Sequence, residues 1–66
     1  MIPLSQFRQI KPGDKVQAYT TTSVPNWHEI IEAEPDRGWA MIELQGHPKG
    51  FLICWADIVD HKAQGE

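Results

Sequence analysis

The stretch at residues 46–60, GHPKGFLICWADIVD, decides the fold of this chain. A polar turn that contains Gly, Pro and Lys leads into the four apolar residues 51–54, and a Trp-Ala-Asp step then leads into the apolar pair 58–59. A run of four apolar residues bounded by turn residues has the length of a buried strand and is too short for an ordinary helix. The stretch therefore predicts a turn, a strand, a tight connection and a last short strand.

Helix-breaking residues recur at short intervals along the rest of the chain. Pro and Gly occur at residues 3, 12–13, 25, 35–38 and 46–50, which leaves no room for a helix of ordinary length. Residues 27–34, WHEIIEAE, mix helix-favouring Glu and Ala with strand-favouring Trp and Ile, and we predict a strand there. Five segments of strand length result: 15–20, 27–33, 39–44, 51–54 and 58–61.

Alternation along these strands divides their side chains between two faces. The expected inner face is aliphatic and carries Val16, Ala18, Ala40, Ile42 and Leu44. The opposite face is mixed and carries Gln17, Tyr19, Trp39, Met41 and Glu43. Asp36-Arg37-Gly38 has the chemistry of a tight turn, which makes residues 27–44 one hairpin. Five short strands hide their edges best by curling into a barrel, so the predicted fold is all-β.

Two pieces of the chain, IKPGDKVQAY at residues 10–19 and GHPKGFLICWADIVD at 46–60, resemble the bacterial SH3-like barrels. In that family an apolar-x-Pro-Gly-Asp-x-Val opening starts the first long strand, and a Gly-aromatic-Ile run enters a one-turn 3₁₀ segment before the last strand. The resemblance implies a five-stranded SH3-like barrel with its 3₁₀ turn at residues 55–57. The expected organisation is an N-terminal lead at 1–9, the barrel at 10–61 and a flexible tail at 62–66.

Three shorter pieces, GDKV at residues 13–16, GWAM at 38–41 and HPKGFLIC at 47–54, are similar to the plasmid-encoded type II dihydrofolate reductases. That family has Gly-Asp-Arg-Val, Gly-Tyr-Ala-Val and His-Pro-Gly-Ser-Val-Gln-Ile-Tyr in the corresponding places. Its Gln-Ile-Tyr strand, from four copies, lines a pore where NADPH and dihydrofolate meet. The resemblance also implies assembly of several copies.

Leu52 and Cys54 stand where the reductases have Gln and Tyr, and only Ile53 matches. These replacements remove the polar groups that orient two polar ligands, and polar recognition fails steeply when partners are missing. We therefore expect no cofactor and no reductase activity. In the alternative, an oligomeric NADPH-dependent enzyme, Leu52, Ile53 and Cys54 form the cofactor-binding strand.

Size and charge restrict the classes of function. A chain of 66 residues makes one domain with a small core, so its stability is marginal and self-association into a homo-oligomer is expected. The net charge of −3, with only six scattered Lys and Arg, makes nucleic acid an improbable partner, although SH3-like barrels in general can bind it. One free cysteine and no long apolar run indicate a cytoplasmic protein away from membranes.

Potential metal ligands and nucleophiles are few. His28, His47, His61 and Cys54 fall on different segments without the paired spacing of zinc sites, so no metal is expected. We predict that His47 is a turn residue, that His61 lies in a fraying end and that Cys54 is an inert buried thiol. Five carboxylates gather on the central hairpin, as a solvated rim or, alternatively, as an acid/base pair: Glu29, Glu32, Glu34, Asp36 and Glu43.

The aromatic residues give two interpretations. In one, Phe51 and Trp55 belong to the core while Trp27 and Trp39 half-cover the barrel. In the other, Tyr19, Trp39 and Met41 form a partner-binding face, since Trp, Tyr and Met are enriched where proteins meet. The predicted function is a non-enzymatic binding module that holds a protein partner or its own copies, with no catalytic residues. A reductase-like enzyme and a nucleic-acid module are the alternatives.

Overall fold

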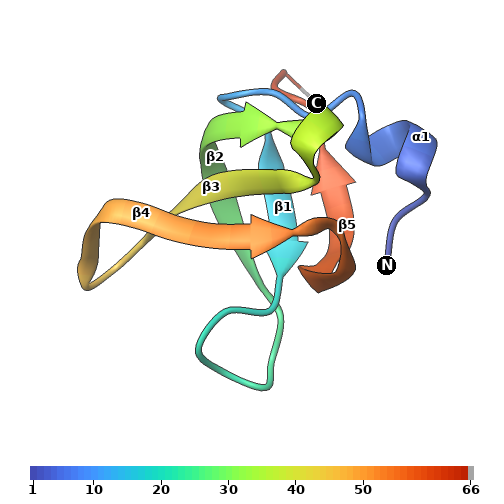
Figure 1. Ribbon diagram of the computed structural model, residues 1–66. Helices are drawn as coiled ribbons and strands as arrows, with labels where there is room; N and C mark the ends of the chain where they lie inside the picture. The colour runs from blue at the N-terminus through green and yellow to red at the C-terminus, as the bar shows by residue number, and fades with distance from the viewer. Residues whose placement is uncertain (66) are drawn as a thin grey trace.

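Five antiparallel strands form one sheet in the order β4-β3-β2-β1-β5, in a computed structural model that describes residues 1–65 (Figure 1). The elements in chain order are α1 (Leu4–Phe7), β1 (Lys15–Ala18), β2 (Asn26–Glu34), η1 (Pro35–Arg37), β3 (Trp39–Leu44), β4 (His47–Cys54), η2 (Trp55–Asp57) and β5 (Ile58–Lys62). The prediction of an all-β fold with a 3₁₀ turn before the last strand is confirmed. Within residues 1–65 no strand pairing joins β4 to β5, so these two strands are the edges of the sheet. Glu66, the end of the predicted tail, lies outside the described residues.

The long strand β2 divides the sheet into two halves. Its first residues pair with β1, and the part from Ile30 onward pairs with β3. Ile31 has no partner in this ladder, because Ile30 pairs with Ile42 while Glu32 pairs with Met41. Such a bulge bends a strand and increases its twist. In Figure 1, β3 and β4 accordingly run in front of β1 and across its direction. We call these the β1–β5 half and the β3–β4 half.

The core lies between the two halves and follows the predicted alternation. Val16, Ala18, Ala40 and Ile42 are fully buried, as expected, while Leu44 is only half-buried. Phe51 and Trp55 are partly buried and pack against the core, in agreement with the first interpretation of the aromatic residues. The complete buried apolar set is Ile2, Phe7, Ile10, Val16, Ala18, Ile30, Ala40, Ile42, Ile53 and Ile58.

The N-terminal segment packs against the sheet, which the sequence did not predict. The short helix α1 buries Phe7 completely, and Ile2 is also buried. The Ile2 N–H donates to the Ile58 carbonyl at 3.3 Å, and the Trp55 indole N–H donates to the Ile2 carbonyl at 2.7 Å. These contacts fasten the lead to η2 and β5, and they enlarge a core that five short strands alone would leave small.

Both hairpins of the β3–β4 half turn at glycines with positive φ. Residues 35–37 form the turn η1, and Gly38 ends it at φ 86°, as the sequence predicted for this hairpin. Gln45 and Gly46 form the turn between β3 and β4. β4 begins at His47, earlier than the predicted strand at 51–54, and the His47 ring packs edge-on against Phe51 with 5.3 Å between centroids. The prediction that His47 lies in the turn was therefore wrong by one position, because His47 is the first residue of β4.

Candidate functional site

The outer side of the β3–β4 half carries a row of paired side chains that do not reach the core. Met41 on β3 lies opposite Leu52 on β4, and Trp39 lies opposite Cys54. Residues directly opposite each other in antiparallel strands project from the same face and contact one another. Strand pairing therefore brings the predicted binding residues Trp39 and Met41 together with Leu52 and Cys54.

Apolar side chains continue from this row onto β2. Leu52 is 59% exposed and Ile31 is 44% exposed, while Trp39 and Met41 are half-buried. A Cβ atom at Gly50 would lie 2.6 Å from Met41 Cγ and 2.7 Å from Ile31 Cδ1, so both side chains lie over the Gly50 backbone. The missing side chain at Gly50 thus lets β2 and β3 contribute to one surface. We call Ile31, Trp39, Met41 and Leu52 the outer apolar face.

Three glutamates border the outer apolar face. Glu32 lies opposite Met41, Glu34 lies opposite Trp39, and Glu43 follows Met41 by two residues on β3. All three are exposed, and within residues 1–65 none of them comes within ion-pair distance of a cation. Three of the five carboxylates predicted to form one rim therefore border this apolar surface, whereas Glu29 lies opposite Lys15 on the other half of the sheet and Asp36 lies in η1.

The other predicted site residues lie elsewhere. Tyr19 is 43% exposed and follows β1, which is two strands from β3, and its backbone N–H donates to the Asp57 carbonyl at 3.0 Å. Strand pairing does not bring Tyr19 to Trp39 or Met41. Of the alternative cofactor strand, Ile53 is buried in the core, while Leu52 and Cys54 face outward.

Cys54 is exposed, so the prediction of a buried thiol was wrong. Alternation places Ile53 inward and turns Cys54 outward at the last position of β4. The Asp57 carboxylate accepts hydrogen bonds from the Cys54 N–H at 3.0 Å and from its Sγ at 3.4 Å. These bonds cap the turn η2 and give Cys54 a structural role.

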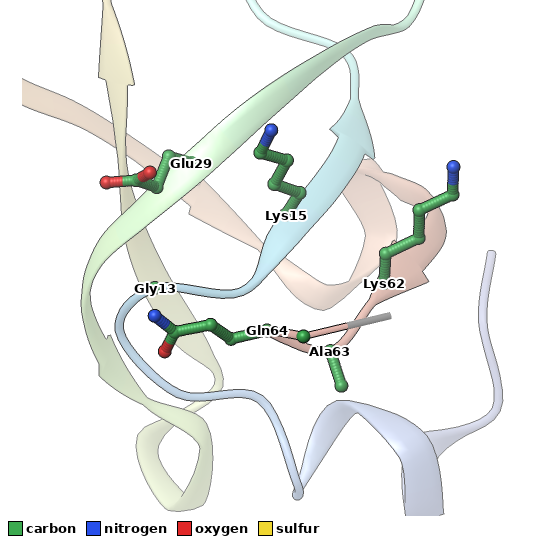
Figure 2. A pocket seen from close by; sticks show the side chains of 7 residues that line it. Gly13, Lys15, Glu29, Lys62, Ala63 and Gln64 are labelled. Carbon is green, nitrogen blue, oxygen red and sulfur yellow. The ribbon is translucent and has the colours of Figure 1, made fainter.

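A polar pocket of about 380 Å³ lies on the opposite half of the sheet (Figure 2). Its lining consists of Gly13, Lys15, Glu29, Lys62, Ala63, Gln64 and Gly65. Lys15 lies between Glu29 and Lys62 in the strand register, and Figure 2 shows the two lysine side chains extending in the same direction. Lys62 Nζ also lies 5.0 Å from the centre of the Trp27 ring. Two ammonium groups suit an anion, but Glu29 offsets one of them at the pocket wall.

A buried carboxylate behind this pocket joins four segments of the chain. Asp14 is 1% exposed and accepts hydrogen bonds from the Lys11 N–H at 3.2 Å and the Gln64 N–H at 2.9 Å. It also accepts one from His61 Nε2 at 3.0 Å, while the Gln6 amide donates to His61 Nδ1 at 3.2 Å. Burial alone raises the pKa of the Asp14 carboxyl, but the bonds from His61, Gln64 and Lys11 outweigh it and hold that pKa below 3.8.

The Asp14 network corrects the prediction that His61 lies in a fraying end. The His61 side chain is 8% exposed and is held on both ring nitrogens, because β5 continues to Lys62 beside β1. Asp14 itself was not singled out from the sequence. Its one signal was the Pro-Gly-Asp opening of the first strand, and a local motif does not show which distant groups an aspartate binds.

Other chemistry is limited in the described part of the chain. Residues 1–65 contain no group of three or more His, Cys, Asp or Glu side chains placed to hold a metal ion. No helix in these residues has the length and apolar character needed to cross a membrane. His28 Nε2 is buried without a hydrogen-bond partner. No protein-family model, curated protein or solved structure matches the chain.

Proposed function

We propose that this protein is a non-enzymatic module that binds another polypeptide through the outer apolar face. The observation that carries the proposal is the contiguity of exposed and half-buried apolar side chains from three strands: Ile31 and Met41 lie over Gly50, and Leu52 lies opposite Met41. Single exposed apolar residues are ordinary on protein surfaces, but a contiguous set with polar residues around it marks an interaction site. Trp and Met are also enriched at the centres of such sites.

The geometry supports binding better than catalysis. The outer apolar face is carried by a curled sheet, and the described pocket lies on the other half, away from Leu52 and Met41. Asp14 and His61 have their hydrogen-bonding atoms occupied by groups of the chain itself. A catalytic acid or base must reach its substrate within hydrogen-bond distance, so these two residues hold the fold together rather than react.

The test begins with a random peptide library displayed on phage and selected against the intact protein. Selected peptides are then measured by calorimetry against Leu52→Ser. We expect affinity to fall at least tenfold, which corresponds to about 1.4 kcal/mol. Val24→Ser is the matched control, since Val24 is 61% exposed and lies in the loop before β2, away from the outer apolar face.

Two results would contradict this proposal. One is the absence of any selected peptide whose binding depends on Leu52. The other is equal loss of affinity in Leu52→Ser and Val24→Ser. Either result would leave the outer apolar face as ordinary surface.

The reductase alternative has a direct assay. We expect no change in nicotinamide absorbance when NADPH and dihydrofolate are added to the protein, because Leu52 and Cys54 carry no group that matches the family's amide and phenol. Turnover that disappears in Leu52→Ser would favour the reductase over the binding module.

A further inference from the structure

The charges around the outer apolar face restrict what can cover it, and this inference rests on the proposed function. Glu32, Glu34 and Glu43 project from the same side of the sheet as Met41 and Trp39. The outer apolar face itself contains no Lys or Arg. A partner that buries these apolar side chains also removes water from the glutamates beside them, and an unpaired carboxylate that loses water is costly.

The same glutamates differ from several other carboxylates of the described chain. Asp14 has three donors, Asp57 accepts from Cys54, and Glu29 lies opposite Lys15 in the strand register. Glu32 and Glu34 lie opposite Met41 and Trp39 in the register, and Glu43 lies across from residues 48–50, which include Lys49. Among residues 1–65 none of the three glutamates has a Lys or Arg within ion-pair distance. In a complex, the cations that compensate Glu32 and Glu34 therefore have to come from the partner.

This charge pattern argues against three occupants. A second copy docked through the same face would bring two sets of three glutamates together, and like charges across an interface are unfavourable. Nucleic acid and anionic lipid present phosphates, which the glutamates repel. A polypeptide with lysine or arginine beside its apolar anchors has the opposite charge and suits both parts of the surface.

We propose that the outer apolar face recognises a polypeptide segment in which apolar anchor residues are flanked by Lys or Arg. The anchors cover Met41 and Leu52, and the basic side chains lie toward the β2 edge of the face, where Glu32 and Glu34 project. Arginine fits a carboxylate with two parallel hydrogen bonds, so it is the preferred flanking residue. Apolar burial supplies affinity here, and the glutamates supply selectivity and faster association.

The experiment compares two phage selections from one random peptide library. The first uses the wild-type protein, and the second uses the variant Glu32→Lys/Glu34→Lys/Glu43→Lys. We expect peptides that bind the wild type to be enriched in Lys and Arg beside apolar residues, and peptides that bind the variant to be enriched in Asp and Glu. For a selected basic peptide, the affinity for Glu32→Gln/Glu34→Gln/Glu43→Gln should be about tenfold lower than for wild type.

The outcomes separate this inference from the proposed function. If selected peptides need Leu52 but show no basic preference, and the glutamine variant binds them as well as wild type does, the charge inference is overturned while the binding module stands. If no peptide binding depends on Leu52, the proposed function fails and the inference fails with it. Should the lysine variant not fold, the glutamine variant and the salt dependence of wild-type binding decide alone, with weaker binding at higher salt expected.

Sedimentation of the wild-type protein over a concentration series tests whether a second copy of the chain covers the outer apolar face. We expect no dimer that depends on the outer apolar face. A dimer that Leu52→Ser abolishes and that Glu32→Gln/Glu34→Gln/Glu43→Gln strengthens would show that a second copy covers this face, and it would overturn the assignment of a basic partner.

Discussion

The outer sides of the two sheet halves follow the same alternation yet present opposite surfaces. On the β1–β5 half, Lys15 lies between Glu29 and Lys62, and Lys62 lies over the Trp27 ring. Charges and the aromatic ring there have neighbours within the chain. On the β3–β4 half, the corresponding positions hold apolar side chains and glutamates that have no Lys or Arg within ion-pair distance in the described residues.

The difference separates stability from recognition. Behind the β1–β5 half, Asp14 and His61 use their hydrogen bonds to join α1, β5 and the residues after β5. The outer side of the β3–β4 half has exposed apolar area that contributes little to folding but is available to a partner. Substitutions on the first half should therefore change stability, and substitutions on the outer apolar face should change binding.

The largest expected effect is on the β1–β5 half. Asp14→Ala leaves the donors of Lys11, Gln64 and His61 without their acceptor, and we expect the free energy of unfolding to fall by about 3 kcal/mol. Urea unfolding followed by circular dichroism measures this value. The control is Asp60→Ala, because Asp60 is exposed and its carboxylate accepts, among residues 1–65, only from the adjacent His61 N–H, so the expected loss is about 0.5 kcal/mol or less. Equal losses in both variants would remove the special role of the buried network.

Acid should lower the free energy of unfolding through the Asp14 network on the same half. The folded-state pKa of Asp14 lies below its ordinary value of 3.8, so its stabilising contribution is complete above that value and is lost as the pH falls through the folded pKa. Urea midpoints of wild type and Asp14→Asn, measured from about pH 6 to about pH 2, should converge at the acid end. A constant difference between the two proteins across this range would contradict the shift.

On the β3–β4 half, Gly50→Ala should lower the free energy of unfolding by about 2 kcal/mol. Gly50 has φ 91°, and the added Cβ would approach Met41 Cγ at 2.6 Å and the Ile42 carbonyl oxygen at 3.2 Å. Gly46→Ala is the matched control, since Gly46 has φ 86° with no atom near the added carbon, and about 1 kcal/mol is expected. Urea unfolding of both variants checks the comparison, and a difference of zero would mean that Met41 and Ile31 do not lie over Gly50.

Trp39→Ala should have a smaller effect on stability and a large one on binding. Trp39 is half-buried, so we expect a loss of about 1 kcal/mol in the free energy of unfolding. Affinity for a selected peptide should fall at least tenfold, as measured by calorimetry. If thermal melting shows a severe loss of stability while peptide affinity stays unchanged, Trp39 belongs to the core and not to the outer apolar face.

The smallest effect is expected for Lys62→Ala. Its contact with Trp27 is worth about 0.5–1 kcal/mol at an exposed site, but its position opposite Lys15 is repulsive by a similar amount. The two contributions should nearly cancel, and urea unfolding should show a change of about 0.5 kcal/mol or less. A large loss would mean that the β1–β5 half depends on its outer side chains as well as on the Asp14 network.

The sequence by itself determined the all-β class, the approximate positions of the five strands along the chain, the turn at Gly38 and four residues of the core: Val16, Ala18, Ala40 and Ile42. Alternation and turn chemistry are local properties, so Val16, Ala40 and Ile42 could be placed inward from their spacing alone. For the candidate site, the same reasoning placed Trp39 and Met41 on one face. Tyr19 was grouped with them by alternation, although its segment leaves the sheet after Ala18.

Only the tertiary structure decided which distant residues meet. Phe7 and Ile2 lie in a segment that has no regular alternation of apolar and polar residues. Their burial depends on a surface that other elements form. Ile31 lies on the same surface as Met41 and Leu52 because of the bulge in β2 and the strand register. Both are set by pairing between segments that are distant in the sequence. Asp14 and His61 are 47 residues apart, and no local pattern links them. Spacing predicts which way a side chain faces, whereas its neighbours across the sheet follow from how the whole chain packs.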